Sequence, residues 1–162
     1  MTRRNYRGTG IQVSFDADLC IHARECVRGL PAVFNRGRRP WILADNAPTE
    51  EVTRVVEHCP TGALQYRLLD GSPGEQPAAA TTVMPVENGP LALRGDLVVR
   101  HEDGTLERLP RAALCRCGQS KNKPFCDNSH LENAFQAPGV SPAEAAATVV
   151  GSTGEARRQP LA

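Results

Sequence analysis

The stretch CRCGQSKNKPFCDNSH, residues 115–130, brings three cysteines and one histidine close together in the sequence. Cys115 and Cys117 are separated by a single residue, so both thiolates can reach one metal atom. Cys126 and His130 are four residues apart, about one helical turn, so their side chains point the same way. Two such pairs indicate two metal atoms rather than one.

The residues around these pairs favour an anionic metal cluster. Asp127 is suited to be the N-cap of a short helix that holds His130 in its first turn. The positive end of that helix would then face the metal bound by Cys126. On ligand count alone, a structural zinc ion is an alternative, although zinc sites usually pair cysteines two to four residues apart. A further alternative is that these are ordinary reduced cysteines in a turn.

The pattern C-x-C-x2-S-x3-P-x-C-D-x-S-H resembles the CDGSH-type (mitoNEET-like) iron–sulfur domain over about residues 84–136. The matching residues are Cys115, Cys117, Ser120, Pro124, Cys126, Asp127, Ser129 and His130. The resemblance implies a 2Fe-2S cluster with Cys115 and Cys117 on one iron and Cys126 and His130 on the other. It also implies a homodimer formed through this part of the chain. The family's glycine is Asn128 here; Asn tolerates a left-handed backbone best after Gly, so we expect the cluster to survive.

The other three cysteines fit a second iron–sulfur motif. Bacterial-type ferredoxin ligation runs C-x2-C-x2-C with a distant Cys-Pro. Cys20 and Cys26 hold the first and third positions, Cys59 precedes a proline, and Ala23 stands at the second position. Residues 11–69 therefore resemble a divergent single-cluster ferredoxin. Three thiolates and a methyl group suit a 3Fe-4S cluster, and a 4Fe-4S cluster with His22 as fourth ligand is the alternative. Buried cysteines without a cluster are a third interpretation.

Hydrophobic patterning predicts an α+β fold, with a small ferredoxin-like α+β half followed by a β-rich CDGSH-type half. Residues 11–16 alternate like a strand, and residues 49–59 space their valines as one face of a helix with Thr49 as N-cap. Residues 63–69 read as a second strand. In the later half, two alternating runs flank Asp103-Gly104, which is a strong hairpin signal.

Composition divides the chain into four segments. We predict a ferredoxin-like domain over residues 11–69 and a CDGSH-type 2Fe-2S domain over residues 83–138. Between them, residues 70–82 (DGSPGEQPAAATT) contain little to bury and are predicted to be a linker. Residues 139–162 are expected to form a flexible tail.

The composition of the whole chain limits the classes of partner. Its 162 residues carry a net charge of +1, which gives no electrostatic reason to expect nucleic acid or an anionic membrane. There is no signal-peptide pattern and no apolar run long enough to span a bilayer, so we expect a cytoplasmic protein. The basic loop RGRRP, residues 36–40, is expected to be a solvated turn, and a surface that meets an acidic redox partner is the alternative interpretation.

These observations favour a two-cluster iron–sulfur protein that acts as a one-electron carrier or redox relay. The sequence has no nucleophile–base pair, phosphate-binding glycine loop or paired acid–base carboxylates, which argues against a substrate-converting enzyme. The expected partner is a redox protein or an apo-acceptor protein. A cluster donor or redox sensor that uses a labile His130 is the first alternative, and a zinc-stabilised interaction module is the second.

Overall fold

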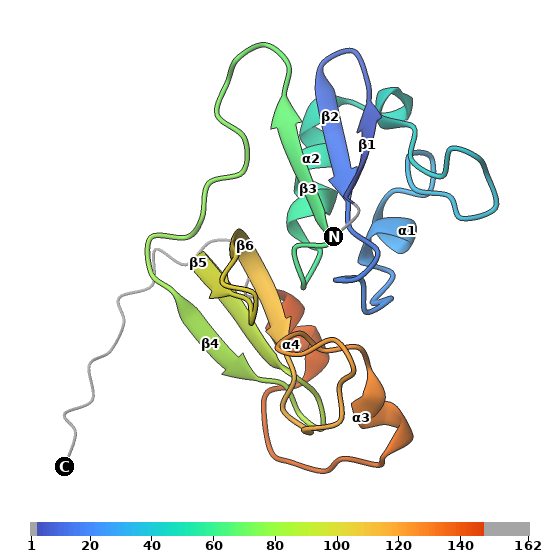
Figure 1. Cartoon of the computed structure of the whole chain (residues 1–162). Coiled ribbons are helices and arrows are strands. Elements are labelled where there is room, and N and C mark those ends of the chain that lie inside the picture. The colour runs from blue at the N-terminus through green and yellow to red at the C-terminus, as the bar shows by residue number, and fades with distance from the viewer. Residues whose placement is uncertain (1–2, 148–162) are drawn as a thin grey trace.

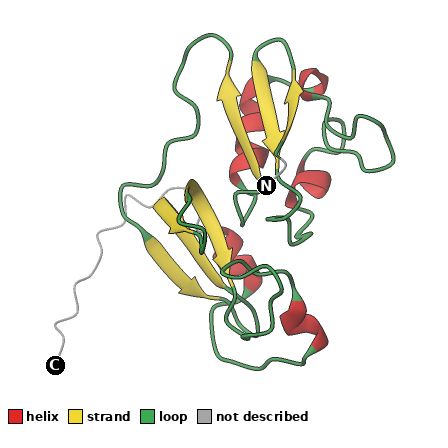
Figure 2. Ribbon diagram, in the orientation of Figure 1, coloured by secondary structure: helices red, strands yellow, loops and turns green. Residues whose placement is uncertain are grey.

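Two small antiparallel sheets, one in each half of the chain, form the framework of the computed structural model, which describes residues 3–147 (Figures 1 and 2). We call the part up to residue 69 the N-terminal half and the part from residue 82 the C-terminal half. This arrangement confirms the predicted α+β fold of two small domains. None of the helices within the described residues is long and apolar enough to cross a membrane.

The N-terminal half is a three-stranded sheet with helices packed on it. Its sheet has the order β1-β2-β3, and its strands and helices are β1 (Arg4–Arg7), β2 (Ile11–Phe15), α1 (Glu25–Gly29), the 3-10 helix η1 (Ala44–Asn46), α2 (Thr49–Glu57) and β3 (Leu64–Leu68). Val52 and Val56 of α2 are fully buried in the core of this half, as the valine spacing predicted. Strand β1, which pairs with β2 from Arg4 to Arg7, was not predicted, because its polar sequence shows no strand alternation.

The predicted N-cap of α2 is wrong by one residue. The helix begins at Thr49, Pro48 holds the N-cap position, and no side chain caps the helix. The proline ring restricts φ, which is −56° here, and the extended backbone at Pro48 leads directly into the helix.

The C-terminal half is a second three-stranded sheet of order β4-β5-β6. Its elements are β4 (Thr82–Pro85), β5 (Leu91–Arg100), β6 (Leu106–Leu114), α3 (Ser129–Glu132) and α4 (Pro142–Ala147). The hairpin at Asp103-Gly104 joins β5 to β6, as predicted, and Gly104 has the positive φ of 84° that such a turn needs.

Regular structure continues into the segment predicted as a tail. Val140 forms a parallel bridge with Val86, and helix α4 follows directly. The remainder of the predicted tail, residues 148–162, lies outside the described residues. The stretch between the sheets has no helix or strand before β4 begins at Thr82. The domain limits themselves stay a prediction.

The two halves share a hydrophobic core. Leu19 and Ala63 from the N-terminal half pack with Leu97, Leu109 and Phe125 of the C-terminal half, and all five are at most 7% exposed. The N-terminal half also has a core of its own between its sheet and α2. The two predicted cluster motifs therefore lie on halves that are packed against each other.

Candidate iron–sulfur sites

The C-terminal site comprises Cys115, Cys117, Cys126 and His130, and it lies where β6 ends. The chain leaves β6 after Leu114, turns through residues 115–123, and returns beside the end of the strand. Two backbone hydrogen bonds join the returning segment to the strand end: Cys115 N donates to Pro124 O (2.8 Å) and Cys126 N donates to Ala113 O (2.8 Å). This pairing brings the two predicted ligand pairs to the same end of the strand.

Within the C-terminal site, each predicted pair lies side by side. The Sγ atoms of Cys115 and Cys117 are 3.9 Å apart, and Cys126 Sγ lies 3.5 Å from His130 Nδ1. Over residues 3–147, no three His, Cys, Asp or Glu side chains are grouped closely enough to ligate one metal ion. Thiolate and imidazole groups are ligands that iron and zinc both take in proteins, so each pair can bind a metal.

Side-chain hydrogen bonds hold the loop of the C-terminal site. Ser120 Oγ donates to Phe125 O (2.6 Å) and accepts from Asn122 N (3.0 Å). Asp127 Oδ1 accepts hydrogen bonds from Ser129 N (3.0 Å) and Ser129 Oγ (2.7 Å). Asp127 Oδ2 accepts one from the backbone amide of Lys121 (2.8 Å). These donors, led by the Ser129 hydroxyl, hold the pKa of Asp127 well below its usual range.

The prediction that Asp127 is a helix N-cap is wrong. Helix α3 begins at Ser129, and Asn128 is its N-cap residue, with φ of 74° and no side-chain cap bond. Asp127 lies one position too early, and its carboxylate instead closes the turn between Lys121 and Ser129. The left-handed backbone at Asn128 is the conformation expected where the family has glycine.

Backbone amides point at two of the predicted thiolate ligands. Gln119 N lies 3.5 Å from Cys117 Sγ, and Asn128 N lies 3.4 Å from Cys126 Sγ. The Gln119 amide is the main reason that the pKa of Cys117 is lowered. Burial raises the pKa of Cys126, and the amide of Asn128 acts in the opposite direction. Such N–H groups favour the thiolate form that binds iron.

The N-terminal site comprises Cys20, Cys26 and Cys59, with His22 beside them. Cys20 follows the buried Leu19, Cys26 lies in α1, and Cys59 comes two residues after α2 ends. His22 and Arg24 both have positive φ, 55° and 65°, and the resulting turn places His22 Nδ1 3.7 Å from Cys20 Sγ.

The three thiols of the N-terminal site are electrostatic neighbours. Burial raises the pKa of Cys26 to about 11, and the charges of Cys59 and Cys20 add to that effect. Burial also raises the pKa of Cys20, again with a contribution from Cys59. Three thiols that would repel one another as thiolates need positive charge between them, and bound iron supplies it.

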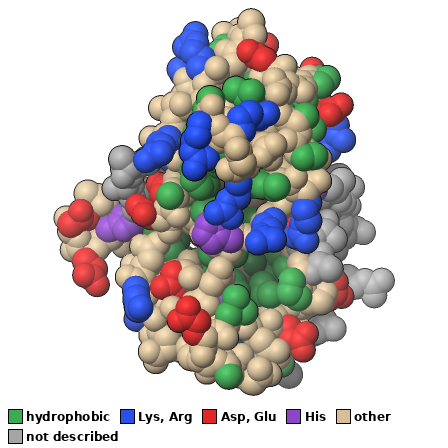
Figure 3. Space-filling view, turned by 90° about the vertical axis from the view of Figure 1, so that its right-hand side faces the viewer, with side chains coloured by type: hydrophobic (Ala, Val, Ile, Leu, Met, Phe, Trp, Pro, Cys, Tyr) green, Lys and Arg blue, Asp and Glu red, His purple; other side chains and the backbone are tan. Residues whose placement is uncertain are grey.

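A cavity of about 920 Å³ opens onto the N-terminal site. Cys20, Cys26 and His22 line it together with Trp41, and four arginines surround them. The arginines are Arg4, Arg24, Arg36 and Arg39. Figure 3 shows Lys and Arg side chains gathered over the upper and middle part of one face, beside a hollow with hydrophobic side chains inside. The donor set, the space and the positive surroundings all fit a negatively charged iron–sulfur cluster.

Sequence reasoning missed the residues that connect the two sites. Asn128 Nδ2 donates to Ile21 O (2.7 Å), and Asn122 Nδ2 donates to Asp18 O (2.7 Å). Arg111 of β6 is 1% exposed and reaches into the N-terminal half. Asn128 stands out in the sequence because the CDGSH-type motif has glycine at this position. No local sequence pattern, however, predicts what its side chain binds. Arg111 lies in an alternating strand, where a charged residue is normally expected to face solvent.

Comparison with known proteins identifies a family for each half. Residues 6–69 match the model of the divergent 4Fe-4S mono-cluster family, and residues 88–131 match the model described as an iron-binding zinc finger of CDGSH type. "Uncharacterized protein YjdI" of Escherichia coli (strain K12) is 44% identical over 64 residues, which are 40% of this chain and 84% of the relative. The protein of the same name from Escherichia coli O157:H7 matches with the same identity and coverage. No solved structure matches significantly.

These matches agree with the two motifs and with their order along the chain. They confirm the predicted resemblances, and they support iron–sulfur binding by both halves. The description of the first family favours four irons over the three that we expected from Ala23. The chain thus belongs to the divergent 4Fe-4S mono-cluster family through its N-terminal half and carries a CDGSH-type iron-binding domain in its C-terminal half.

Proposed function

We propose that this protein is a one-electron carrier or relay with two iron–sulfur clusters. The observation that carries the proposal is the pairing of ligands in the C-terminal site, where Cys115 lies beside Cys117 and Cys126 lies beside His130. These four residues would hold a 2Fe-2S cluster. When bound, such clusters accept and release single electrons, and the chain supplies ligands, N–H donors and shielding from water.

In the N-terminal site, Cys20, Cys26 and Cys59 would be the thiolate ligands. We propose a 4Fe-4S cluster with His22 as the fourth ligand, because its ring lies beside Cys20 and faces the same cavity. A 3Fe-4S cluster held by the three cysteines is the alternative.

One experiment tests the assignment of both clusters. The protein is purified anaerobically, iron, sulfide and zinc are counted per chain, and EPR spectra are recorded in oxidised and reduced states. We expect six irons and six sulfides, the sum of one four-iron and one two-iron cluster. Five irons, with a three-iron EPR signal in the oxidised state, would support the 3Fe-4S alternative. A colourless protein that contains zinc would refute the proposal.

A second candidate function is cluster donation or redox sensing. His130 and Cys117 are partly exposed, so water and protons can reach the C-terminal site. Protonation of a histidine ligand competes with metal binding. Rapid transfer of the 2Fe-2S cluster to an apo-acceptor protein, without comparable electron transfer, would favour this function over electron carriage.

We propose an acidic redox protein as the partner at the N-terminal site. Arg4, Arg24 and Arg36 line its cavity and are exposed, and their guanidinium groups have no hydrogen bond or ion pair within the described part of the chain. Opposite charge steers association and makes it sensitive to salt. Electron transfer from an acidic ferredoxin-type donor should slow as ionic strength rises. A rate that is independent of salt would count against this surface.

We also propose a homodimer formed through the C-terminal half. Each strand of its sheet carries one exposed large apolar residue: Val83 is 56% exposed, Val98 53% and Leu106 68%. Burial of such residues against a second copy would remove apolar surface from water. Sedimentation should give twice the chain mass for the protein and a lower mass for Leu106→Lys. A monomer at all concentrations would refute the dimer.

A further inference from the structure

Cys59 lies at the boundary between the two halves. Its side chain packs against the core of the N-terminal half and also against the core that the two halves share. Thr61, two residues later, has its Oγ1 3.7 Å from Cys59 Sγ, and Ala63 is buried in the shared core. The third thiolate of the N-terminal site is therefore surrounded by groups from both halves.

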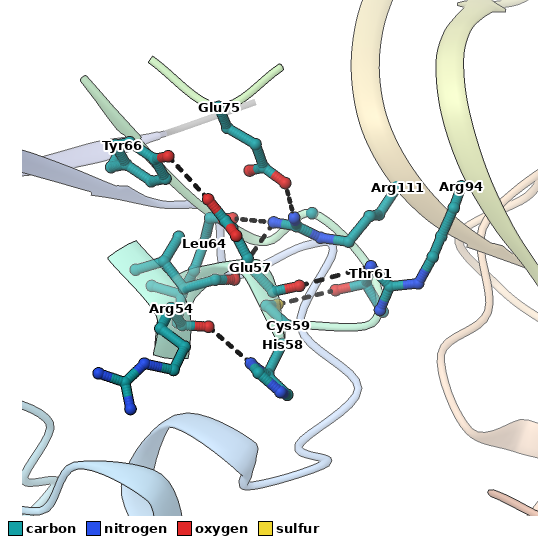
Figure 4. A network of polar contacts seen from close by, with 12 residues as sticks. Arg54, Glu57, His58, Cys59, Thr61, Leu64, Tyr66, Glu75, Arg94 and Arg111 are labelled. Carbon is teal, nitrogen blue, oxygen red and sulfur yellow. Dashed lines mark hydrogen bonds and ion pairs between the residues drawn. The ribbon is translucent and has the colours of Figure 1, made fainter. Parts of the chain in front are cut away.

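Two arginines of the C-terminal sheet reach the segment that carries Cys59 (Figure 4). Arg111 on β6 donates from Nη2 to Val56 O (3.2 Å) and to Leu64 O (3.1 Å). Arg94 on β5, which pairs with Arg111 in the sheet, donates from Nη1 to Glu57 O (3.4 Å). Arg111 thus binds carbonyl oxygens on both sides of Cys59, and Arg94 binds one on the N-terminal side.

The backbones of the two halves touch at the same place. Gly62 has φ of 69°, and a Cβ atom there would lie 2.7 Å from Arg111 O, closer than such contacts allow. A residue with a side chain would push β6 away from the loop after Cys59. The approach of Arg111 therefore depends on a glycine that is three residues from the predicted ligand.

The charges around Cys59 are unevenly compensated. Arg111 pairs with Glu75, and Glu57 accepts a hydrogen bond from Tyr66 (2.7 Å). Arg94, by contrast, forms no ion pair with a carboxylate within the described residues, and its guanidinium group makes one hydrogen bond, to a carbonyl. Burial lowers the pKa of Arg94, and nearby Cys59 and Glu57 act in the opposite direction. An arginine stays protonated despite such a shift, so it brings a full positive charge.

We propose that the C-terminal half completes the N-terminal cluster site, with Arg94 and Arg111 as positioning residues that hold positive charge beside Cys59 and raise that cluster's reduction potential. The inference rests on the proposed function. Reduction adds one electron from an external donor protein and breaks no bond, so the product is more negative by one charge. Nearby cations stabilise the reduced form more than the oxidised form.

The test measures both midpoint potentials in full-length variants, by redox titration followed by EPR. Arg94→Gln should lower the equilibrium constant for reduction of the N-terminal cluster by about tenfold, the effect of one unit charge at about 12 Å in a medium of effective dielectric near 20. Tenfold corresponds to a fall of about 59 mV for one electron. The potential of the C-terminal cluster should change less. Arg94→Lys keeps the charge and should restore most of the potential.

Two further variants distinguish charge from structure. Arg108→Gln removes the same charge from an exposed position on β6, where Arg108 pairs with Asp96, and should leave both potentials unchanged. Glu75→Gln removes the negative partner of Arg111 and should shift the N-terminal potential upwards, opposite to Arg94→Gln.

The outcomes separate this inference from the proposed function. Absence of an N-terminal cluster from the unmutated protein would refute the proposed function. Both clusters present, with equal shifts in Arg94→Gln and Arg108→Gln or no shift in either, would overturn the inference alone. If Arg94→Gln loses the cluster, the Glu75→Gln shift decides: an upward shift supports the inference and no shift overturns it.

Discussion

The two cluster sites are supported in different ways. The C-terminal site has its predicted ligands within residues 115–130, and hydrogen bonds within the same loop hold them. The N-terminal site has its predicted ligands spread from Cys20 to Cys59, and two arginines from the other half of the chain bind the segment that carries Cys59. A local site can be recognised in a sequence because the residues that support it lie beside its ligands. When the supporting residues come from another part of the chain, the sequence motif reveals only the ligands.

The surroundings also shift the pKa values of the cysteines differently in the two sites. The amide of Gln119 lowers the pKa of Cys117, whereas burial raises the pKa of Cys26 to about 11. The surroundings of Cys117 therefore favour its thiolate before any metal binds, whereas burial disfavours the thiolate at Cys126 and, in the N-terminal site, at Cys20 and Cys26. We infer that the N-terminal site depends more on iron, and on positive charge from its surroundings, to hold its cysteines ionised.

Removal of one cluster tests most directly whether the two sites are independent. Cys117→Ser should abolish the 2Fe-2S signal, because one iron loses half of its protein ligands. The N-terminal cluster should keep its EPR signal, since the two predicted ligand sets share no residue. The measurement is EPR of the reduced protein together with iron and sulfide counts.

The reciprocal variant is the control for that experiment. Cys20→Ser should remove the N-terminal signal and leave the 2Fe-2S signal. If Cys117→Ser loses both signals while remaining folded, the sites are not independent, and the C-terminal cluster is then needed to hold the interface.

Much of the fold could be predicted because its signals are local. The alternation around Asp103-Gly104 and the valine spacing of α2 fix the main hairpin and the main helix. Strands β1 and β4 were missed because each is four residues long and mostly exposed, so no apolar alternation marks them. Arg94 and Arg111 were missed for another reason: their partners are backbone carbonyls of the N-terminal half, which leave no trace in the sequence.

The ligand predictions for both sites remain predictions, although neighbouring ligands lie close together in the structure. In the C-terminal site, sequence spacing was sufficient to predict two ligand pairs, formed by Cys115 with Cys117 and by Cys126 with His130. For the N-terminal site, spacing left open whether His22 or no side chain fills the fourth position. The turn at His22, with its positive φ, could not be read from a sequence in which neither Gly nor Asn marks it.

Replacement of the predicted histidine ligand should affect the C-terminal site alone. His130→Cys changes the formal charge of the oxidised 2Fe-2S cluster from −1 to −2, so its midpoint potential should fall, the direction seen between histidine- and cysteine-ligated centres. The N-terminal potential should be nearly unchanged. Protein-film voltammetry measures both.

The same variant changes the response to acid. Protonation of His130 competes with iron, so the unmutated cluster should be lost as pH falls. Burial lowers the pKa of His130, which moves this loss to lower pH than for an exposed histidine, and the nearby Asp127 acts in the opposite direction. Without the imidazole, the decay of absorbance between about pH 5.5 and 6.5 should slow. Unchanged potential and unchanged decay in a variant that keeps 2Fe-2S would exclude His130 as a ligand.

The smallest expected effect concerns Asn128, which joins the two sites directly. Asn128→Gly should keep the 2Fe-2S cluster, because glycine readily adopts the φ of 74° found there. The variant loses the hydrogen bond to Ile21 O, a contribution of about 1 kcal/mol. Amide hydrogen exchange in residues 18–22 should therefore speed up by about fivefold if opening of the interface limits it, while exchange in β6 stays the same. Asn122→Ala, which loses the bond to Asp18 O outside the ligand set, is the matched control and should speed exchange in the same segment. Loss of the 2Fe-2S cluster from Asn128→Gly would show that the asparagine is needed for the cluster loop itself. Unchanged exchange in residues 18–22 would show that its side chain does not tie the loop to the N-terminal half.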